Sequence, residues 1–223
     1  TAEQVYAGLA GLIFVEDDNS DQLDLPKDYG VNDFPLIIQD RSFDADNQFD
    51  YAGAYDPDGT YGDTLLVNGT INPFVEVKNE QIRLRLVNGS NARNYTFGLE
   101  NGAEFHQIAS DGGFLEQPVA LTSVTLTPGE RAEIIVDLSG YAEGDTVKLM
   151  DGNVTVLSLN VTEETDAQTA LPQTLNEITE LTTEGAAVQR FTLSGMSFMV
   201  NINGSQFDME RIDTEQHLNE TVI

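Results

Sequence analysis

The side chains that could carry chemistry are few and widely spaced. The 223 residues include two histidines, His106 and His217, and no cysteine. A blue copper centre needs two histidines with a cysteine thiolate, and a catalytic zinc usually needs three converging His or carboxylate ligands. The spacing suggests neither set. We therefore expect His106 to be a hydrogen-bonded structural residue on a strand and His217 a surface residue in a polar connector.

An acidic segment from Asp44 to Asp50 has the composition of a calcium-binding loop. It departs from the EF-hand pattern, because Phe49 stands where glycine is required and Tyr55 where the bidentate glutamate should be. We predict no dedicated calcium site there, with adventitious cation binding among the carboxylates as the alternative.

Three methionines lie near the C-terminus, each with a phenylalanine close in sequence. Thioethers bind soft Cu(I), but methionines beside aromatic rings more often fill a core, and we predict core filling. The methionines are Met196, Met199 and Met209, and the phenylalanines are Phe191, Phe198 and Phe207.

Seven Asn-x-Ser/Thr sequons begin at Asn68, Asn88, Asn94, Asn153, Asn160, Asn203 and Asn219. Three of them are Asn-Gly pairs, which tight β-turns favour for their own reasons, so we predict a turn role unless the host glycosylates. The chain has no Gly-x-Ser-x-Gly elbow, phosphate loop or dinucleotide fingerprint. On residue chemistry alone, we predict no catalytic, cofactor-binding or metal-binding residue in this chain.

The composition limits the partners. A formal net charge of −28, from 38 acidic and 10 basic residues, repels nucleic acid and anionic membrane surfaces. A solvated surface is the simplest interpretation, and a salt-rich habitat would also fit. The absence of cysteine excludes disulfides, and no apolar run reaches the ~20 residues of a membrane span. The nearest run, Ala7 to Val15, predicts a buried strand rather than a signal peptide.

The elements that must position these side chains are predicted to be strands. Between Gly62 and Leu138, short runs of Val, Ile, Leu, Thr and Phe alternate with turn dipeptides, which is typical of an antiparallel β-sandwich or barrel. Asn88-Gly89 and Asn101-Gly102 are predicted to turn the chain between consecutive strands. Strands are predicted at residues 12–16, 34–40, 65–67, 74–77, 82–86, 95–99, 105–109, 124–126, 134–138, 147–150, 154–161, 191–193 and 198–202.

Several phrases of the sequence resemble a known family. They are Gly62 to Gly69 (GDTLLVNG), Arg83 to Arg93 (RLRLVNGSNAR), Asp111-Gly112-Gly113 and Leu126 to Glu133 (LTPGERAE). These phrases are similar to the middle cupredoxin domain of three-domain multicopper oxidases, above all the bacterial laccase-like and cuprous oxidases and their copper-free cell-division relatives. Thr1 to Gly11 resembles the segment that follows a His-x-His copper motif, and Ile202 to Met209 resembles the opening of the third domain.

The resemblance implies an all-β, cupredoxin-like Greek-key β-sandwich or barrel divided as follows. Residues 1–16 would be the final strand of a truncated first cupredoxin domain, 17–33 a connector and 34–163 the complete middle domain. Residues 164–187 would be a linker with room for one short helical turn, and 188–223 the opening strands of a truncated third domain.

The resemblance also implies a parent protein that oxidises its substrates one electron at a time and reduces dioxygen to water. In the family, the copper ligands come from the first and third domains, so this chain alone is expected to be inactive and free of copper. Its partners would be those two domains of the same polypeptide. Export is the family tendency, while the sequence leaves the compartment open. Met209, Asp208 and Asp213 are weak candidates for the outer substrate side of cuprous oxidases.

Two other functions remain as alternatives. The intact protein could be a copper-free scaffold, like the cell-division relatives of the family. The chain could also be an independent carbohydrate-binding or protein-binding module, which would need a contiguous exposed aromatic patch, such as one formed by Tyr51, Tyr55 and Tyr61.

Two structural expectations follow. First, Arg83 and Arg85 alternate with apolar residues on a strand that is predicted to be half-buried. Arg85 or Arg93 could bridge to acidic residues of an adjoining domain. Glu130 and Arg131 could form pairs across strands. Residues 1–16 and 188–223 would carry unpaired strand edges, so we expect self-association unless these fragments pair with each other or fold back.

Overall fold

The computed structural model describes residues 1–166, 169–196, 199–218 and 221–223. The chain divides into two compact units, Thr1–Glu177 and Ile178–Ile223, which are described separately. The start of the predicted 198–202 strand at Phe198 and the sequon at Asn219 lie outside the described residues. Both described helices are five residues long, and none is long and apolar enough to cross a membrane.

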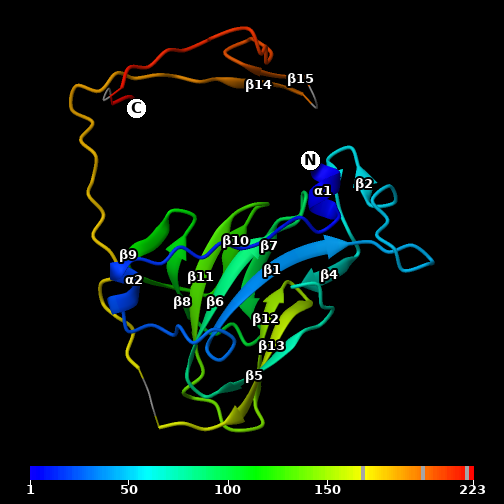
Figure 1. Cartoon of the computed structure of the whole chain (residues 1–223), viewed down its shortest axis with the longest axis vertical. Helices are drawn as coiled ribbons and strands as arrows, with labels where there is room; N and C mark the ends of the chain where they lie inside the picture. The colour runs from blue at the N-terminus through cyan, green and yellow to red at the C-terminus, as the bar shows by residue number, and fades with distance from the viewer. Residues whose placement is uncertain (167–168, 197–198, 219–220) are drawn as a thin grey trace. The chain divides into compact units, whose positions relative to one another are not determined.

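The first unit is a sandwich of two sheets (Figure 1). The larger sheet has the order β4-β1-β6-β11-β8-β9. Its strands are β1 (Asp33–Arg41), β4 (Thr64–Val67), β6 (Gln81–Asn88), β8 (Phe105–Ser110), β9 (Gly113–Leu121) and β11 (Arg131–Asp137). All its pairs are antiparallel except β1 with β6, which run parallel.

The smaller sheet has the order β10-β7-β12-β13-β5. Its strands are β5 (Phe74–Lys78), β7 (Tyr95–Leu99), β10 (Val124–Leu126), β12 (Thr146–Asp151) and β13 (Val154–Glu163). A small β2–β3 hairpin (Tyr55–Asp56 and Gly59–Thr60) lies outside both sheets. The predicted all-β class is therefore confirmed.

The core fills the space between the two sheets, because alternate side chains of each strand point inward. On β6 the inward residues Ile82, Leu84 and Leu86 are fully buried, and they meet Phe97 of β7 and Leu149 of β12 in one cluster. Burying such side chains contributes about 1.5–3 kcal/mol each.

The predicted hairpin turns are only partly right. Asn101-Gly102 does form a turn, in which Gly102 has φ +68°, but it carries the chain from β7 in one sheet to β8 in the other and closes no hairpin. Asn88 ends β6 and is completely buried, with no turn at Asn88-Gly89. Asn68-Gly69 is the turn expected, with positive φ at both residues.

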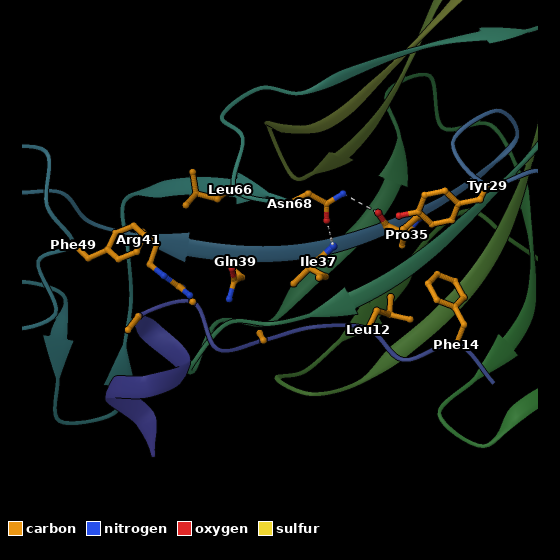
Figure 2. Close-up of a pocket in the computed structure, with 14 residues that line it drawn as sticks. Leu12, Phe14, Tyr29, Pro35, Ile37, Gln39, Arg41, Phe49, Leu66 and Asn68 are labelled. Atoms are coloured by element: carbon orange, nitrogen blue, oxygen red, sulfur yellow. Dashed lines mark hydrogen bonds between the residues drawn. The ribbon is translucent and has the colours of Figure 1, made fainter.

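Residues 1–16 contain no strand, which corrects the prediction for Leu12 to Glu16. They begin instead with helix α1 (Ala2–Tyr6), whose N-terminus is capped by a capping box between Thr1 and Gln4. The following segment crosses the larger sheet beside β1 in Figure 2. Because β1 is already paired on both edges, by β4 and β6, the segment finds no free strand ladder there.

Helix α2 (Asp18–Gln22) and strand β9 are elements that the sequence did not predict. Asp17 caps α2 by accepting a hydrogen bond from the Ser20 amide at 2.8 Å. The described part of the linker 164–187 contains no helix.

In the described part of the second unit, β14 (Leu193–Met196) pairs antiparallel with β15 (Met199–Ile202). Its β14 starts two residues later than the predicted 191–193 strand. None of the described residues from 178 to 223 is buried, and a two-stranded hairpin alone cannot build a core.

Candidate functional site: a joint between the two connectors

The residues do not fit a copper centre. His106 lies half-buried on β8, and His217 is exposed in the second unit. Among the described residues, no group of three or more His, Cys, Asp or Glu is placed to hold a metal ion. The chain also lacks the cysteine thiolate that a blue copper centre requires. His106 lies on a strand, as expected, and its ring makes no hydrogen bond to a described residue.

The acidic loop uses its carboxylates to close its own turns. Asp44 Oδ1 accepts from the amides of Asp46 at 2.9 Å and Gln48 at 2.8 Å, and Asp50 Oδ1 accepts from Gly53 at 2.7 Å. Asx-type turns of this kind satisfy the backbone locally. They give no evidence of converging cation ligands.

The three loop tyrosines do not share one environment. Tyr51 packs edge-on against Tyr6 with ring centroids 5.2 Å apart, and Arg93 lies over the ring of Tyr61. Tyr55 is 65% exposed in the β2–β3 hairpin. Two of the three rings are therefore engaged within the unit, which weakens the case for an aromatic binding patch.

The predicted core role of the methionines is wrong. Met196, Met199 and Met209 are 80%, 57% and 84% exposed. Phe191 and Phe207 are exposed as well, because the unit that holds them has no buried interior in its described part.

Arg83 and Arg85 form a buried ionic network on the outer face of the larger sheet. Arg85 donates to both carboxylate oxygens of Asp33, at 2.8 and 2.5 Å, and Arg83 pairs with Glu133. Burial works to lower the pKa of Arg85, but its hydrogen bonds to Asp33 and the charge of Glu133 outweigh it and raise that pKa. The strand β6 is therefore buried on both faces and not half-buried as expected.

A second network lies near the end of β1. Asp40 Oδ2 accepts from Arg93 Nε and from the Gly62 amide, both at 2.8 Å, and Arg93 also donates to the Gly62 carbonyl. A Cβ on Gly62 would lie 2.2 Å from the Arg41 amide nitrogen, so only glycine fits there. Arg85 and Arg93 thus find acidic partners within their own unit.

Beside the turn after β10, Arg131 forms an ion pair with a residue distant in sequence, as expected, whereas Glu130 bonds within its own turn and not across strands. Arg131 pairs with Asp111 at 2.8 Å, while Glu130 accepts a hydrogen bond from the Thr127 amide. Both residues of the Arg131 pair are about half exposed, so its contribution to stability is small.

The two connectors of the chain meet on the outer face of the larger sheet. Leu25 from the first connector (17–33) and Leu175 from the linker (164–187) pack together over Ile108 of β8 and Ile135 of β11. All four are 6% exposed or less. We call this cluster the connector joint.

Hydrogen bonds fasten the connector joint. Asn19 Nδ2 of α2 donates to the Leu175 carbonyl at 2.9 Å, and the Leu175 amide donates to the Glu116 carbonyl of β9 at 2.8 Å. Arg83 also donates to the Pro26 carbonyl. In Figure 1, α2 lies beside β8 and β9. Segments about 150 residues apart are thereby fixed to one another and to the sheet.

An open cavity of about 640 Å³ lies beside the N-terminal segment (Figure 2). Its lining includes Leu12, Ile37, Leu66 and Asn68. The Asn68 side chain bridges the Pro35 carbonyl and the Ile37 amide, so its polar groups are already used.

Sequence reasoning missed the connector joint. Leu25 and Leu175 lie in polar segments, each with one other leucine close by, Leu23 and Leu171, which also pack against the cluster. So few apolar residues did not mark either segment as part of a core. The one usable signal was Asp17 with Ser20, which is a helix-capping pattern ahead of α2.

Comparisons with known proteins agree on one family. The family model described as multicopper oxidase matches residues 32–146. Multicopper oxidase mco of Staphylococcus haemolyticus (strain JCSC1435) is 42% identical over 224 residues, covering 100% of this chain and 46% of that protein. Cell division protein FtsP of Proteus mirabilis (strain HI4320) is 40% identical over 231 residues, covering 95% of this chain and 48% of that protein.

Solved structures give the same result. The crystal structure of a laccase from Pediococcus acidilactici matches with a TM-score of 0.92 at 42% identity, covering 99% of this chain and 48% of that one. McoA multicopper oxidase of the hyperthermophile Aquifex aeolicus matches with a TM-score of 0.83 at 39% identity, covering 92% and 48%. The chain spans about half the length of the relatives it matches.

Proposed function

The chain belongs to the multicopper oxidase family, and from that premise we propose that it serves as the copper-free middle part of a laccase-like oxidase. In this proposal the intact polypeptide carries copper-bearing cupredoxin domains on both sides of residues 34–163. Those domains oxidise the substrate one electron at a time and reduce dioxygen to water. The role of this chain is to hold them in register.

The connector joint is the observation that carries this role. The segments that enter and leave the sandwich are fixed to each other through Asn19 and Leu175 and to the sheet through Ile108 and Ile135. Since the buried groups on both connectors share one cluster, a movement of either connector disturbs the other. A rigid joint of this kind fixes the relative orientation of the two flanking domains to which the connectors lead in this proposal.

Other parts of the proposal concern the setting of the intact protein. Export from the cytoplasm is the family tendency, and we place the protein outside the cytoplasm. The exposed apolar side chains of the second unit, among them Phe207 and Leu218, are proposed to pack against the neighbouring domain. In the isolated chain they would promote self-association.

A copper-free scaffold is the second candidate. It is favoured by the similarity to the cell division protein FtsP, which is nearly as high as that to mco. The middle domain would play the same mechanical part in either case, because the joint itself does not depend on copper.

Copper content separates the two candidates. We expect the intact polypeptide, purified after copper loading, to contain bound copper, to show the visible absorption of a copper–thiolate bond and to consume dioxygen with a phenolic substrate. Intact protein that retains no copper after dialysis would establish the scaffold. This 223-residue chain alone should show no copper–thiolate band, because it has no cysteine.

The joint itself is tested with Leu175→Ala in the intact protein. Truncating this buried leucine should cost about 2–5 kcal/mol and expose both connectors to protease. At temperatures well below unfolding, copper content should be retained while turnover falls several-fold, because the flanking domains lose their fixed direction.

Leu157→Ala is the matched control, since Leu157 is equally buried but lies in the core between the sheets. It should lower stability by a similar amount and leave both the connectors and the turnover unchanged. Equal loss of turnover in the two variants would mean that the joint contributes only to stability.

A further inference from the structure

Six of the seven sequons begin at described residues, and the fold gives them very different environments. Asn88 is fully buried, and its Nδ2 donates to the carbonyls of Arg93 and Leu126. Asn68 uses both ends of its amide in a turn, and Asn203 does the same, with Thr192 and Arg190 as partners. A glycan on any of these three would displace hydrogen bonds of the fold.

Two other sequons are exposed and lie at the same end of the smaller sheet. Asn153 stands at the tip of the β12–β13 hairpin, and Asn94 immediately precedes β7. The Thr96 amide of the second sequon donates to Asp151 Oδ1 at 2.8 Å, two residues before Asn153, and Asp151 pairs with Phe97 in the ladder. Neither Asn94 nor Asn153 uses its side-chain amide in a hydrogen bond to a described residue.

A pair of identical tripeptides shows what the fold adds to the motif. Asn153-Val154-Thr155 and Asn160-Val161-Thr162 have the same sequence. Asn160, however, lies inside the sheet, paired with Thr146 on one side and Glu76 on the other. It is half-buried, and its Oδ1 accepts from the Thr146 hydroxyl at 2.9 Å. Glycan acceptors belong on surface loops, so only the first tripeptide qualifies.

We propose that Asn153 and Asn94 are N-glycosylation sites, and that the other four described sequons serve the fold. The donor is an oligosaccharide linked through phosphate to a lipid. The Asn Nδ2 attacks the anomeric carbon, an N–C bond forms, the C–O bond to phosphate breaks, and the lipid phosphate leaves while the amide loses a proton. No electron is exchanged in this transfer.

Two glycans at this end of the sandwich would cover the β12–β13 hairpin tip and the start of β7 with neutral, hydrated bulk. Both positions lie away from the connector joint, which is built on β8 and β11 of the other sheet. The modification is therefore compatible with packing of the connectors. It rests on the proposed location outside the cytoplasm and is independent of the proposed oxidase chemistry.

The test measures the mass of the whole protein produced in the organism that encodes it. Thr155→Ala destroys the Asn153 sequon without touching Asn153, and Thr155→Ser preserves it. We expect the alanine variant to lose the mass of one glycan and the serine variant to keep it. Thr96→Ala and Thr96→Ser should behave in the same way for Asn94.

Thr162→Ala is the control, since it destroys the sequence-identical sequon at Asn160. Its mass should differ from that of the unaltered protein only by the substituted side chain. A protein with no added mass would overturn the proposal. It would equally be overturned if Thr155→Ala and Thr96→Ala kept every glycan, or if Thr162→Ala lost one.

Discussion

Several charged side chains of this chain pair with one another within the fold, among them Arg85 with Asp33 and Arg93 with Asp40. Asp33 is 3% exposed, and its carboxylate accepts three hydrogen bonds from Arg85. A buried charge is tolerated only when it is paired and hydrogen-bonded. The ion pairs of Arg83 and Arg85 with Asp33 and Glu133 thus hold β6 to its neighbours β1 and β11.

Tyr95 provides a test at this scale, because it is 1% exposed and hydrogen-bonded to the Ser90 hydroxyl at 2.7 Å. Burial, with a further contribution from the charge of Asp40, raises the pKa of Tyr95 above the ordinary value of 10.0. The unfolded chain therefore ionises first. The stabilisation is complete below pH 10 and declines as the pH rises beyond it.

We expect Tyr95→Phe to cost about 0.5–1.5 kcal/mol at neutral pH through the lost hydrogen bond. Above pH 10 its free energy of unfolding should fall less steeply than that of the unaltered chain. Denaturant titrations at a series of pH values measure both effects, and parallel curves for the two proteins would contradict the assignment.

Single side chains also attach whole elements, as α1 illustrates. A five-residue helix has no stability of its own, and α1 is held by Tyr6, which is 2% exposed. The Tyr6 hydroxyl accepts from the Ser42 amide at 2.7 Å, and Arg41 lies over its ring and donates to the Val5 carbonyl. The attachment concentrates on one ring because the residues that follow, such as Leu9, are largely exposed.

Tyr6→Ala should therefore release residues 1–16 while the sandwich stays folded. Limited proteolysis should cut this segment at least tenfold faster, with little change in the melting temperature of the core. Leu9→Ala, at a 70% exposed position of the same segment, should leave the cleavage rate unchanged. If residues 1–16 of the Tyr6→Ala variant resisted protease as well as those of the unaltered chain, contacts other than Tyr6 would hold the segment.

The whole molecule carries far more negative charge than its pairs can balance. The ion pairs described above use four of the ten basic residues, and the net charge remains −28. Such a charge destabilises a compact state through its own repulsion. Salt should relieve that repulsion, since the screening length falls from about 10 Å at 0.1 M to about 3 Å at 1 M.

We expect the melting temperature to rise by several degrees between about 0.1 M and 1 M potassium chloride, with most of the rise at the lower concentrations. An uncharged osmolyte at equal osmolarity is the control and should reproduce little of the effect. If the melting temperature stayed constant or fell as salt was added, repulsion among the acidic residues would not be the main electrostatic effect on stability.

Much of the fold was predictable because strands and turns leave local signals. Residues 95–99 and 124–126 were predicted with the bounds that β7 and β10 have. The alternation of apolar and polar residues along a strand, and the Asn-Gly or Pro-Gly pairs of turns, involve only residues close in sequence. They can therefore be recognised without the tertiary structure. The family, too, was identified from the sequence, because phrases such as Leu126 to Glu133 are distinctive.

What the sequence could not decide depends on long-range neighbours. The apolar run from Leu12 to Val15 has the composition of a strand, yet both edges of β1 are occupied. Arg83 and Arg85 alternate as on a half-exposed strand, yet the connectors and Glu133 cover them.

For the candidate site, the sequence by itself determined that this chain has no cysteine ligand for a blue copper centre, because a missing cysteine is visible in composition. Only the tertiary structure decided that Leu25 and Leu175 form one joint and that two identical Asn-Val-Thr tripeptides differ in exposure. Composition is a property of the chain alone. Burial and pairing are created when distant segments meet, so they are decided by the packing of the two sheets.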